Sequence, residues 1–153
     1  MPYDAILAAP FGALGIRTEA GALTGIDFLP REAGARAPRT AAAEQACRQL
    51  ERYFADPAHS FSLVLRLRAT PFRTAVWARL QAIPRGNPIS YGALARELGS
   101  SARAVGQACG DNPIPVVVPC HRVVARGGLG GFMHAADAAP LAIKHWLLAH
   151  EGC

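Results

Sequence analysis

The apolar run 114–118, followed at once by Pro119, Cys120 and His121, is the feature that most limits how this chain can fold. Five consecutive positions without a charged side chain predict a buried segment, which we expect to be a strand. A buried strand that ends at a proline would hold the Cys120 thiol and the His121 imidazole at the bottom of a pocket. Most free cysteines are inert packing residues, so the neighbours of Cys120 must decide its function.

The composition sets the limits on size and compartment. A chain of 153 residues with 51% hydrophobic and 18% charged residues fits one domain or two small lobes. The first residues lack the basic region of a secretory signal, and no apolar run approaches the ~20 residues of a membrane span. We therefore expect an intracellular protein, cytoplasmic or, in a eukaryote, nuclear.

Cysteine spacing argues against a disulfide framework and against zinc. The four cysteines form no C-x-x-C pair, and no histidine is spaced to complete a zinc site. In a reducing compartment Cys120 would remain a free thiol. We expect no metal and no cofactor.

Positive charge is concentrated in the second half of the chain. Residues 1–63 carry a net charge of −1, whereas residues 64–153 carry nine arginines and one lysine against four acids, a net +6. Such an asymmetry is typical of proteins that bind nucleic acid, although a merely solvated basic surface would look the same.

The pattern of apolar runs and turns predicts an α+β fold. We expect an N-terminal α/β lobe over residues 1–68, with a small antiparallel sheet and one helix, and a mostly helical lobe over residues 69–153. In the first lobe, runs at 3–9, 13–18 and 23–29 alternate with turn residues, and Thr40 caps an amphipathic helix at 41–54. Residues 61–67 are a further candidate strand.

The second lobe contains the outline of a helix-turn-helix. Thr70 and Pro71 begin a helix whose apolar stripe continues to Ile83. Ser90 caps a short helix at 91–98, residues 99–101 form a tight turn, and a second helix spans 102–109. A last helix, opened by Pro140, covers 141–150, with Leu141, Trp146 and Leu147 facing inward.

The second helix of this pair carries small side chains at Ala102, Ala104 and Gly106, and its one charged residue is Arg103. A helix that reads bases in the major groove usually exposes several polar side chains. Small residues instead favour close approach to a narrow minor groove, with one long cation reaching between bases. Packing of the small face against the core explains the segment equally well.

After Cys120, residues 124–132 are glycine-rich but lack the strand and helix context of a phosphate-binding loop, so we expect a flexible flap.

The thiol needs a base, because the thiolate is the attacking species and an unperturbed thiol has a pKa near ~8.5. His121 is adjacent, but neighbouring side chains on an extended strand point to opposite faces. The two can cooperate only across a sharp turn or through a bridging water. A carboxylate that orients the imidazole must be Asp111, Asp137 or Glu151, the only acids after Glu97. Asn112 is placed to hold a turn and contact the thiol.

Four ordered motifs resemble the O6-alkylguanine-DNA alkyltransferases. They are residues 102–106, Asn112 with Pro113, residues 119–124 and residues 146–152. The resemblance covers 70–153 closely, whereas the first lobe resembles the family only in size and strand-rich character.

The resemblance implies DNA repair by an irreversible, single-turnover transfer of an alkyl group from O6-alkylguanine, and also O4-alkylthymine, to the protein's own cysteine. The damaged base is flipped out of duplex DNA that is bound through the minor groove, and the protein acts as a monomer that can cluster on DNA. Cys120 would be the acceptor and His121 its base through a water, with Glu151 orienting His121 and Asn112 holding the turn. Arg103 resembles an arginine finger that fills the gap left by the base.

The remaining implied contacts surround the base. Tyr91 resembles a tyrosine that pushes on the neighbouring phosphate, and the helix carrying Ala102, Ala104 and Gly106 would lie in the groove. We expect Phe132, Cys109 and Val123 to line the pocket. Phe132 stands where the family usually has tyrosine, so the pocket lacks one hydroxyl donor, and we expect an open or mobile flap over 127–139.

Two other interpretations use the same residues. A non-catalytic helix-turn-helix protein could bind or sense lesions, but non-catalytic relatives replace the cysteine that this chain keeps. A thiol hydrolase using Cys120 and His121 would turn over repeatedly, and it gives no reason for the basic half.

Overall fold

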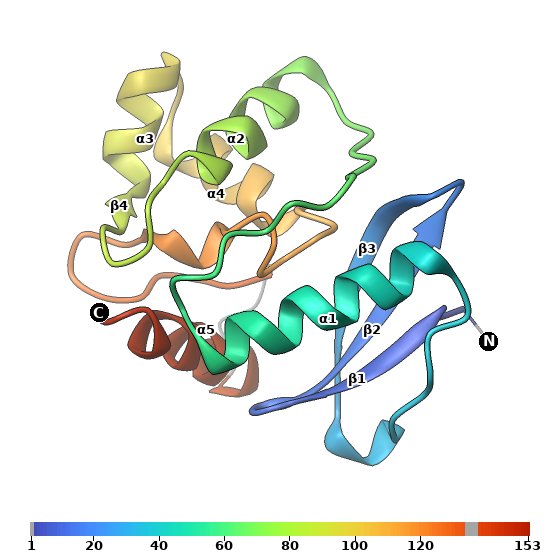
Figure 1. Ribbon diagram of the computed structural model, residues 1–153. Helices are drawn as coiled ribbons and strands as arrows, with labels where there is room; N and C mark the ends of the chain where they lie inside the picture. Colours follow the sequence, from blue (N-terminus) through green and yellow to red (C-terminus); the bar gives the residue numbers. More distant parts are fainter. Residues whose placement is uncertain (1, 134–137) are drawn as a thin grey trace. The chain divides into compact units, whose positions relative to one another are not determined.

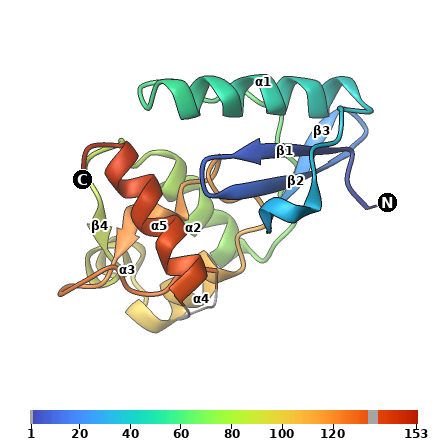
Figure 2. The same ribbon diagram turned by 90° about the horizontal axis from the view of Figure 1, so that it is seen from below.

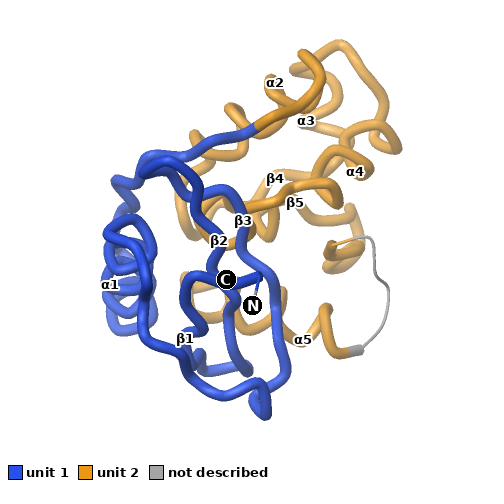
Figure 3. The backbone as a smooth tube through the Cα atoms, turned by 90° about the vertical axis from the view of Figure 1, so that its right-hand side faces the viewer, with its two compact units in different colours: residues 1–67 blue, residues 68–153 orange. Residues whose placement is uncertain are grey.

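The chain divides between Leu67 and Arg68 into two units (Figure 3). The computed structural model describes residues 2–133 and 138–153. Figure 1 shows the three-stranded sheet and its helix at the N-terminal end of the sequence and the shorter helices after it. In the described part of the chain, no helix is long and apolar enough to cross a bilayer.

Unit 1 is an antiparallel meander. Strands β1 (Ala5–Ala9), β2 (Gly12–Glu19) and β3 (Ala22–Leu29) pair in the order β1-β2-β3. The two-residue connection between β2 and β3 consists of Ala20 and Gly21, both with positive φ. This is the backbone that a tight hairpin requires, because such turns match the twist of the flanking strands.

The helix α1 (Ala41–Ala55) packs on this sheet (Figure 2). The hydroxyl of Thr40 accepts a hydrogen bond from the amide of Ala43 at 3.0 Å, as the sequence predicts for an N-cap. The predicted apolar face is the buried one, and it consists of Ala43, Ala46, Cys47, Leu50 and Tyr53. A 3₁₀ helix, η1 (Arg31–Ala33), lies in the preceding loop.

The predicted strand at 61–67 is reduced to one bridge between Leu65 and Leu23. The amide of Ser62 is bonded at 2.8 Å to the side chain of Gln49, which also donates to the Ser62 hydroxyl. Because the Ser62 amide donates to Gln49, it is not available to pair with β3, and the strand does not extend to Ser62.

Three helices of unit 2 start where the sequence predicts them, two of them after the predicted caps Thr70 and Ser90. α2 (Pro71–Gln81), α3 (Tyr91–Leu98) and α4 (Ala102–Gly110) follow Thr70, Ser90 and Ser101, each of whose hydroxyls accepts from an amide in the first turn. Gly99 ends α3 in the left-handed conformation at φ 64°. The two helices and three-residue turn predicted at 91–109 are therefore formed.

The buried strand predicted at 114–118 is wrong. The segment is buried but forms a series of turns, and the amide of Val118 bonds to the carbonyl of Ile114 within it. Pro113 and Pro115 lack the N–H groups that a strand pairs through. The short parallel pair in this unit is instead β4 (Ile89–Ser90) with β5 (Val123–Val124).

The last helix, α5, spans Ala138–His150 and so begins three residues before the predicted start. Pro140 falls in its first turn, where a missing N–H costs no intrahelical hydrogen bond. Of the residues expected to face inward, Leu147 is buried, whereas Leu141 and Trp146 are half-buried. Residues 134–137 of the predicted flap lie outside the described residues.

Candidate active site

Cys120 begins a 3₁₀ helix, η2 (Cys120–Arg122), and lines a cavity of about 350 Å³. The sharp turn that cooperation with His121 requires is therefore present. Seven of the predicted site residues line this cavity: Tyr91, Ala102, Arg103, Gly106, Cys109, Cys120 and Phe132.

Of the residues predicted to contact DNA or to line the pocket, two do not line the cavity. Val123 is fully buried in β5, where its backbone pairs with β4. Ala104 lies on α4 two residues after Ala102, so the helical rotation points it away from the face shared by Ala102, Gly106 and Cys109. Met133, which the sequence analysis did not identify as a site residue, also lines the cavity.

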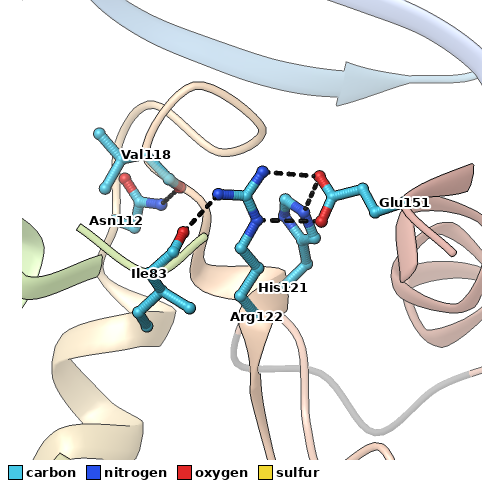
Figure 4. A network of polar contacts seen from close by, with 6 residues as sticks. All are labelled: Ile83, Asn112, Val118, His121, Arg122 and Glu151. Atoms are coloured by element: carbon cyan, nitrogen blue, oxygen red, sulfur yellow. Dashed lines mark hydrogen bonds and ion pairs between the residues drawn. The ribbon is translucent and has the colours of Figure 1, made fainter. Parts of the chain in front are cut away.

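His121 and Glu151 are buried and form a network with the partly buried Arg122 (Figure 4). Nε2 of His121 lies 2.9 Å from Oε2 of Glu151. Arg122 donates to both carboxylate oxygens of Glu151, each at 2.9 Å, and to the carbonyl of Ile83 at 2.6 Å. Glu151, one residue after α5, therefore joins the C-terminal end of the chain to η2.

This network sets the protonation of the imidazole. Burial lowers the pKa of His121, against the raising effect of Glu151, so the ring is neutral near pH 7. An ionised carboxylate only accepts hydrogen bonds, so the ring proton lies on Nε2. Nδ1 then carries the lone pair, and this buried atom has no hydrogen-bond partner in the described part of the chain.

Of the three candidate acids, Glu151 is the one beside His121. Asp111 forms an ion pair with Arg73, and Asp137 lies outside the described residues.

Asn112 holds the turn segment before Cys120. Its side-chain oxygen accepts from the amide of Ile114 at 3.0 Å, and its amide donates to the carbonyl of Val118 at 2.8 Å. One side chain thus joins both ends of the segment that was expected to be a strand.

The thiol of Cys120 is 3% exposed. Burial raises the pKa of Cys120 to about 11, while a hydrogen bond with Asn112 and the positive charge of Lys144 act in the lowering direction. At neutral pH the sulfur is a thiol, so a base must remove its proton before it attacks.

Lys144 is the site residue that the sequence analysis missed. It is fully buried on α5, and its Nζ donates to the carbonyls of Val123, Leu129 and Gly131 at 2.6 to 2.8 Å. The spacing of Lys144 in the sequence could have indicated its burial, because it lies three residues before Leu147 on the inward face of the helix.

Tyr91 forms one wall of the cavity at the start of α3. Its hydroxyl lies 3.3 Å from both the carbonyl of Gly131 and Nζ of Lys144. Gly130, at φ 74°, packs so closely that an added Cβ would lie 2.7 Å from the Tyr91 ring. Residues 129–131 of the predicted flap are thus packed on α3, and Phe132 is buried. Among the described residues, no three His, Cys, Asp or Glu side chains are grouped to hold a metal ion.

Comparison with known proteins agrees with this geometry. Residues 71–153 match the family model for the DNA-binding domain of 6-O-methylguanine DNA methyltransferase. A methylated-DNA–protein-cysteine methyltransferase of Methanosarcina acetivorans is 36% identical over 98% of both chains. The crystal structure of the Mycobacterium tuberculosis O6-methylguanine methyltransferase superposes with a TM-score of 0.80 at 34% identity, covering 95% of this chain and 90% of that one. A structure of the mycobacterial protein in complex with DNA has the same TM-score and coverage at 36% identity. The chain belongs to the family of methylated-DNA–protein-cysteine methyltransferases.

Proposed function

We propose that this protein repairs DNA by moving an alkyl group, usually methyl, from O6 of a guanine to Sγ of Cys120. The observation that carries the proposal is the position of Cys120 in a cavity next to His121, whose far nitrogen is held by Glu151. Family membership supports the reaction, because the relatives that match this chain are named for methyl transfer from DNA to a protein cysteine.

The proton route follows from the tautomer of His121. Nδ1 accepts the thiol proton through a bridging water, and Glu151 stabilises the imidazolium that forms. The S–C bond forms as the C–O6 bond breaks, and the departing guanine takes up a proton at the end of the step. The product is a thioether, a bond that water does not cleave under mild conditions, so each molecule reacts once and needs no cofactor.

The base must leave the helix before the buried sulfur can reach its O6 substituent. A cavity of about 350 Å³ lies within the ~300–1,000 Å³ range of small-molecule sites, which suits a single base. We place α4 in the minor groove, with Ala102 and Gly106 allowing close approach and the exposed Arg103 filling the vacated stack. Phe132 closes the cavity with an apolar ring, and O4-alkylthymine fits the same chemistry. The protein would act as a monomer in the compartment that holds the DNA, cytoplasmic or nuclear.

Intact-mass measurement tests the transfer. After incubation with a duplex that contains O6-methylguanine, we expect one added methyl group per molecule and none in Cys120→Ser. Cys109→Ser is the matched control, because Cys109 is a second buried cysteine that lines the same cavity. In that variant the added methyl should persist, and peptide mapping should place it on Cys120.

The same experiment separates the alternatives. Tight binding of the damaged duplex without any mass change would identify a lesion-binding protein, and repeated cleavage of small esters would identify a hydrolase. Arg103→Ala should slow transfer from the duplex more than transfer from free O6-benzylguanine, and equal losses on both substrates would contradict the finger role.

A further inference from the structure

A second hollow of about 480 Å³ lies beside the Cys120 cavity. The two share Tyr91 and Ala102 as a common wall. The far side of this hollow carries two arginines from different segments, Arg96 on α3 and Arg126 in the loop after β5. We call it the arginine pocket and define it by Arg96, Arg126, Tyr91 and Ala102.

Neither arginine has a partner among the described residues. Their side chains are exposed, and neither makes a hydrogen bond or ion pair within the described part of the chain. The described acids of this unit are engaged elsewhere: Glu97 pairs with Arg79, Asp111 with Arg73, and Glu151 with His121 and Arg122. The fourth acid, Asp137, lies outside the described residues. The positive charge of the pocket is therefore not balanced by the described protein.

Arg96 is folded back along its own helix. Its Nη1 lies 3.8 Å from the position that a Cβ on Gly92 would occupy, one turn nearer the start of α3. This brings the guanidinium to the end of the helix that carries partial positive charge, an arrangement that is unfavourable until an anion is added. Geometry and charge thus indicate the same kind of ligand.

We propose that the arginine pocket binds a backbone phosphate of the damaged strand, next to the nucleotide whose base enters the Cys120 cavity. The inference rests on the proposed function, and it identifies the group of the DNA that the arginine pocket binds. A nucleotide whose base lies on one side of Tyr91 and Ala102 must carry its sugar and phosphate across that wall. Guanidinium groups suit the far side, because they bind phosphate oxygens in a forked geometry.

The first test separates phosphate binding from chemistry. We expect Arg96→Ala/Arg126→Ala to react with a duplex that contains O6-methylguanine about tenfold more slowly or worse, the loss expected for charge-assisted hydrogen bonds. Its reaction with free O6-benzylguanine should be unchanged, because that substrate has no phosphate. Arg52→Ala/Arg85→Ala removes the same charge from exposed arginines outside the pocket and should keep the duplex rate. Arg96→Lys/Arg126→Lys should recover part of it.

The second test locates the phosphate. Single phosphates on either side of the lesion are replaced by uncharged methylphosphonates. The wild-type protein should be slowed at one flanking position, and the double alanine variant should be insensitive there. Equal slowing of both proteins at every position, or an unchanged duplex rate in the double variant, would overturn the arginine pocket while leaving alkyl transfer intact. Absence of mass gain from either substrate in the wild-type protein would overturn the proposed function and this inference together.

Discussion

A buried lysine contributes to the environment of the Cys120 sulfur. Lys144 joins carbonyl groups from β5 and from the loop that follows it, and its charge acts on Cys120 in the direction that favours the thiolate. Burial lowers the pKa of Lys144 itself to about 8. The residue is therefore a positioning residue that also affects the acidity of the nucleophile.

Lys144→Met keeps the length of the side chain but removes its donors and its charge. We expect a loss of about 1–3 kcal/mol in the free energy of unfolding, because buried carbonyls lose their partner. The pH–rate profile with O6-benzylguanine should move to higher pH, because the pKa of Cys120 rises without the nearby cation.

Chemical denaturation and rate measurements between pH 6 and 10 (roughly the range in which thiols titrate) check both expectations. His145→Ala, at an exposed position of the same helix, is the control. A stability loss without a shift of the pH–rate profile would show that Lys144 has a structural role alone.

At the scale of elements, the walls of the cavity depend on irregular backbone. Three helices of unit 2 start where the sequence predicts them, but Cys120 follows the irregular turn segment 114–118, and the cavity is also lined by Gly131, Phe132 and Met133 from the loop after β5. Val116 in the first and Gly130 in the second both have φ of 74°. Gly130 is the tighter case, because its Cα faces the Tyr91 ring and the Ala125 amide.

Gly130→Ala should push this loop off α3. An added Cβ would lie 2.7 Å from Tyr91 and 3.2 Å from the amide of Ala125, in a backbone conformation that alanine disfavours. We expect a cost of about 1–3 kcal/mol in stability and a slower reaction with O6-benzylguanine. Gly127→Ala in the same loop meets no atom within 4 Å and should be neutral. Identical melting temperatures and rates for the two variants would contradict the proposed packing of this loop.

At the scale of the whole molecule, the two halves of the chain differ in net charge. The +6 of residues 64–153 accompanies the cavity, the arginine pocket and α4, whereas residues 1–63 carry −1. A polyanionic partner is therefore attracted to the part of the chain that holds Cys120, the proposed nucleophile.

Salt concentration should change the rate of reaction with duplex DNA but not the rate of the alkyl-transfer step itself. The second-order rate constant of transfer from a duplex should fall with rising salt. When the logarithm of the binding constant is plotted against the logarithm of the salt concentration, the slope should be about −0.9 for each phosphate that the protein neutralises. The rate with uncharged O6-benzylguanine should hardly change. Stopped-flow or quench measurements between 50 and 200 mM salt, about the range over which such effects are large, provide the comparison. Parallel salt dependence of both substrates would contradict electrostatic attraction of the duplex.

The sequence by itself determined much of the local structure and pointed to Cys120 as the candidate nucleophile. Caps and tight turns depend on residues three or four positions apart, so the helix starts after Thr40, Thr70 and Ser90 were predicted from their caps, and the start at Ala102 was predicted from the turn before it. Cys120 and His121 are adjacent, so their chemistry was visible without a fold.

Only the tertiary structure decided which groups surround that nucleophile. The sequence left three candidate acids for the position beside His121. Glu151 occupies it because the end of α5 contacts η2, thirty positions earlier in the sequence. The three carbonyls that accept from Lys144 belong to Val123, Leu129 and Gly131, so the partners of this lysine likewise depend on segments that meet in space. Such contacts satisfy buried polar groups across long separations, and they leave no periodic pattern in the chain from which they could have been predicted.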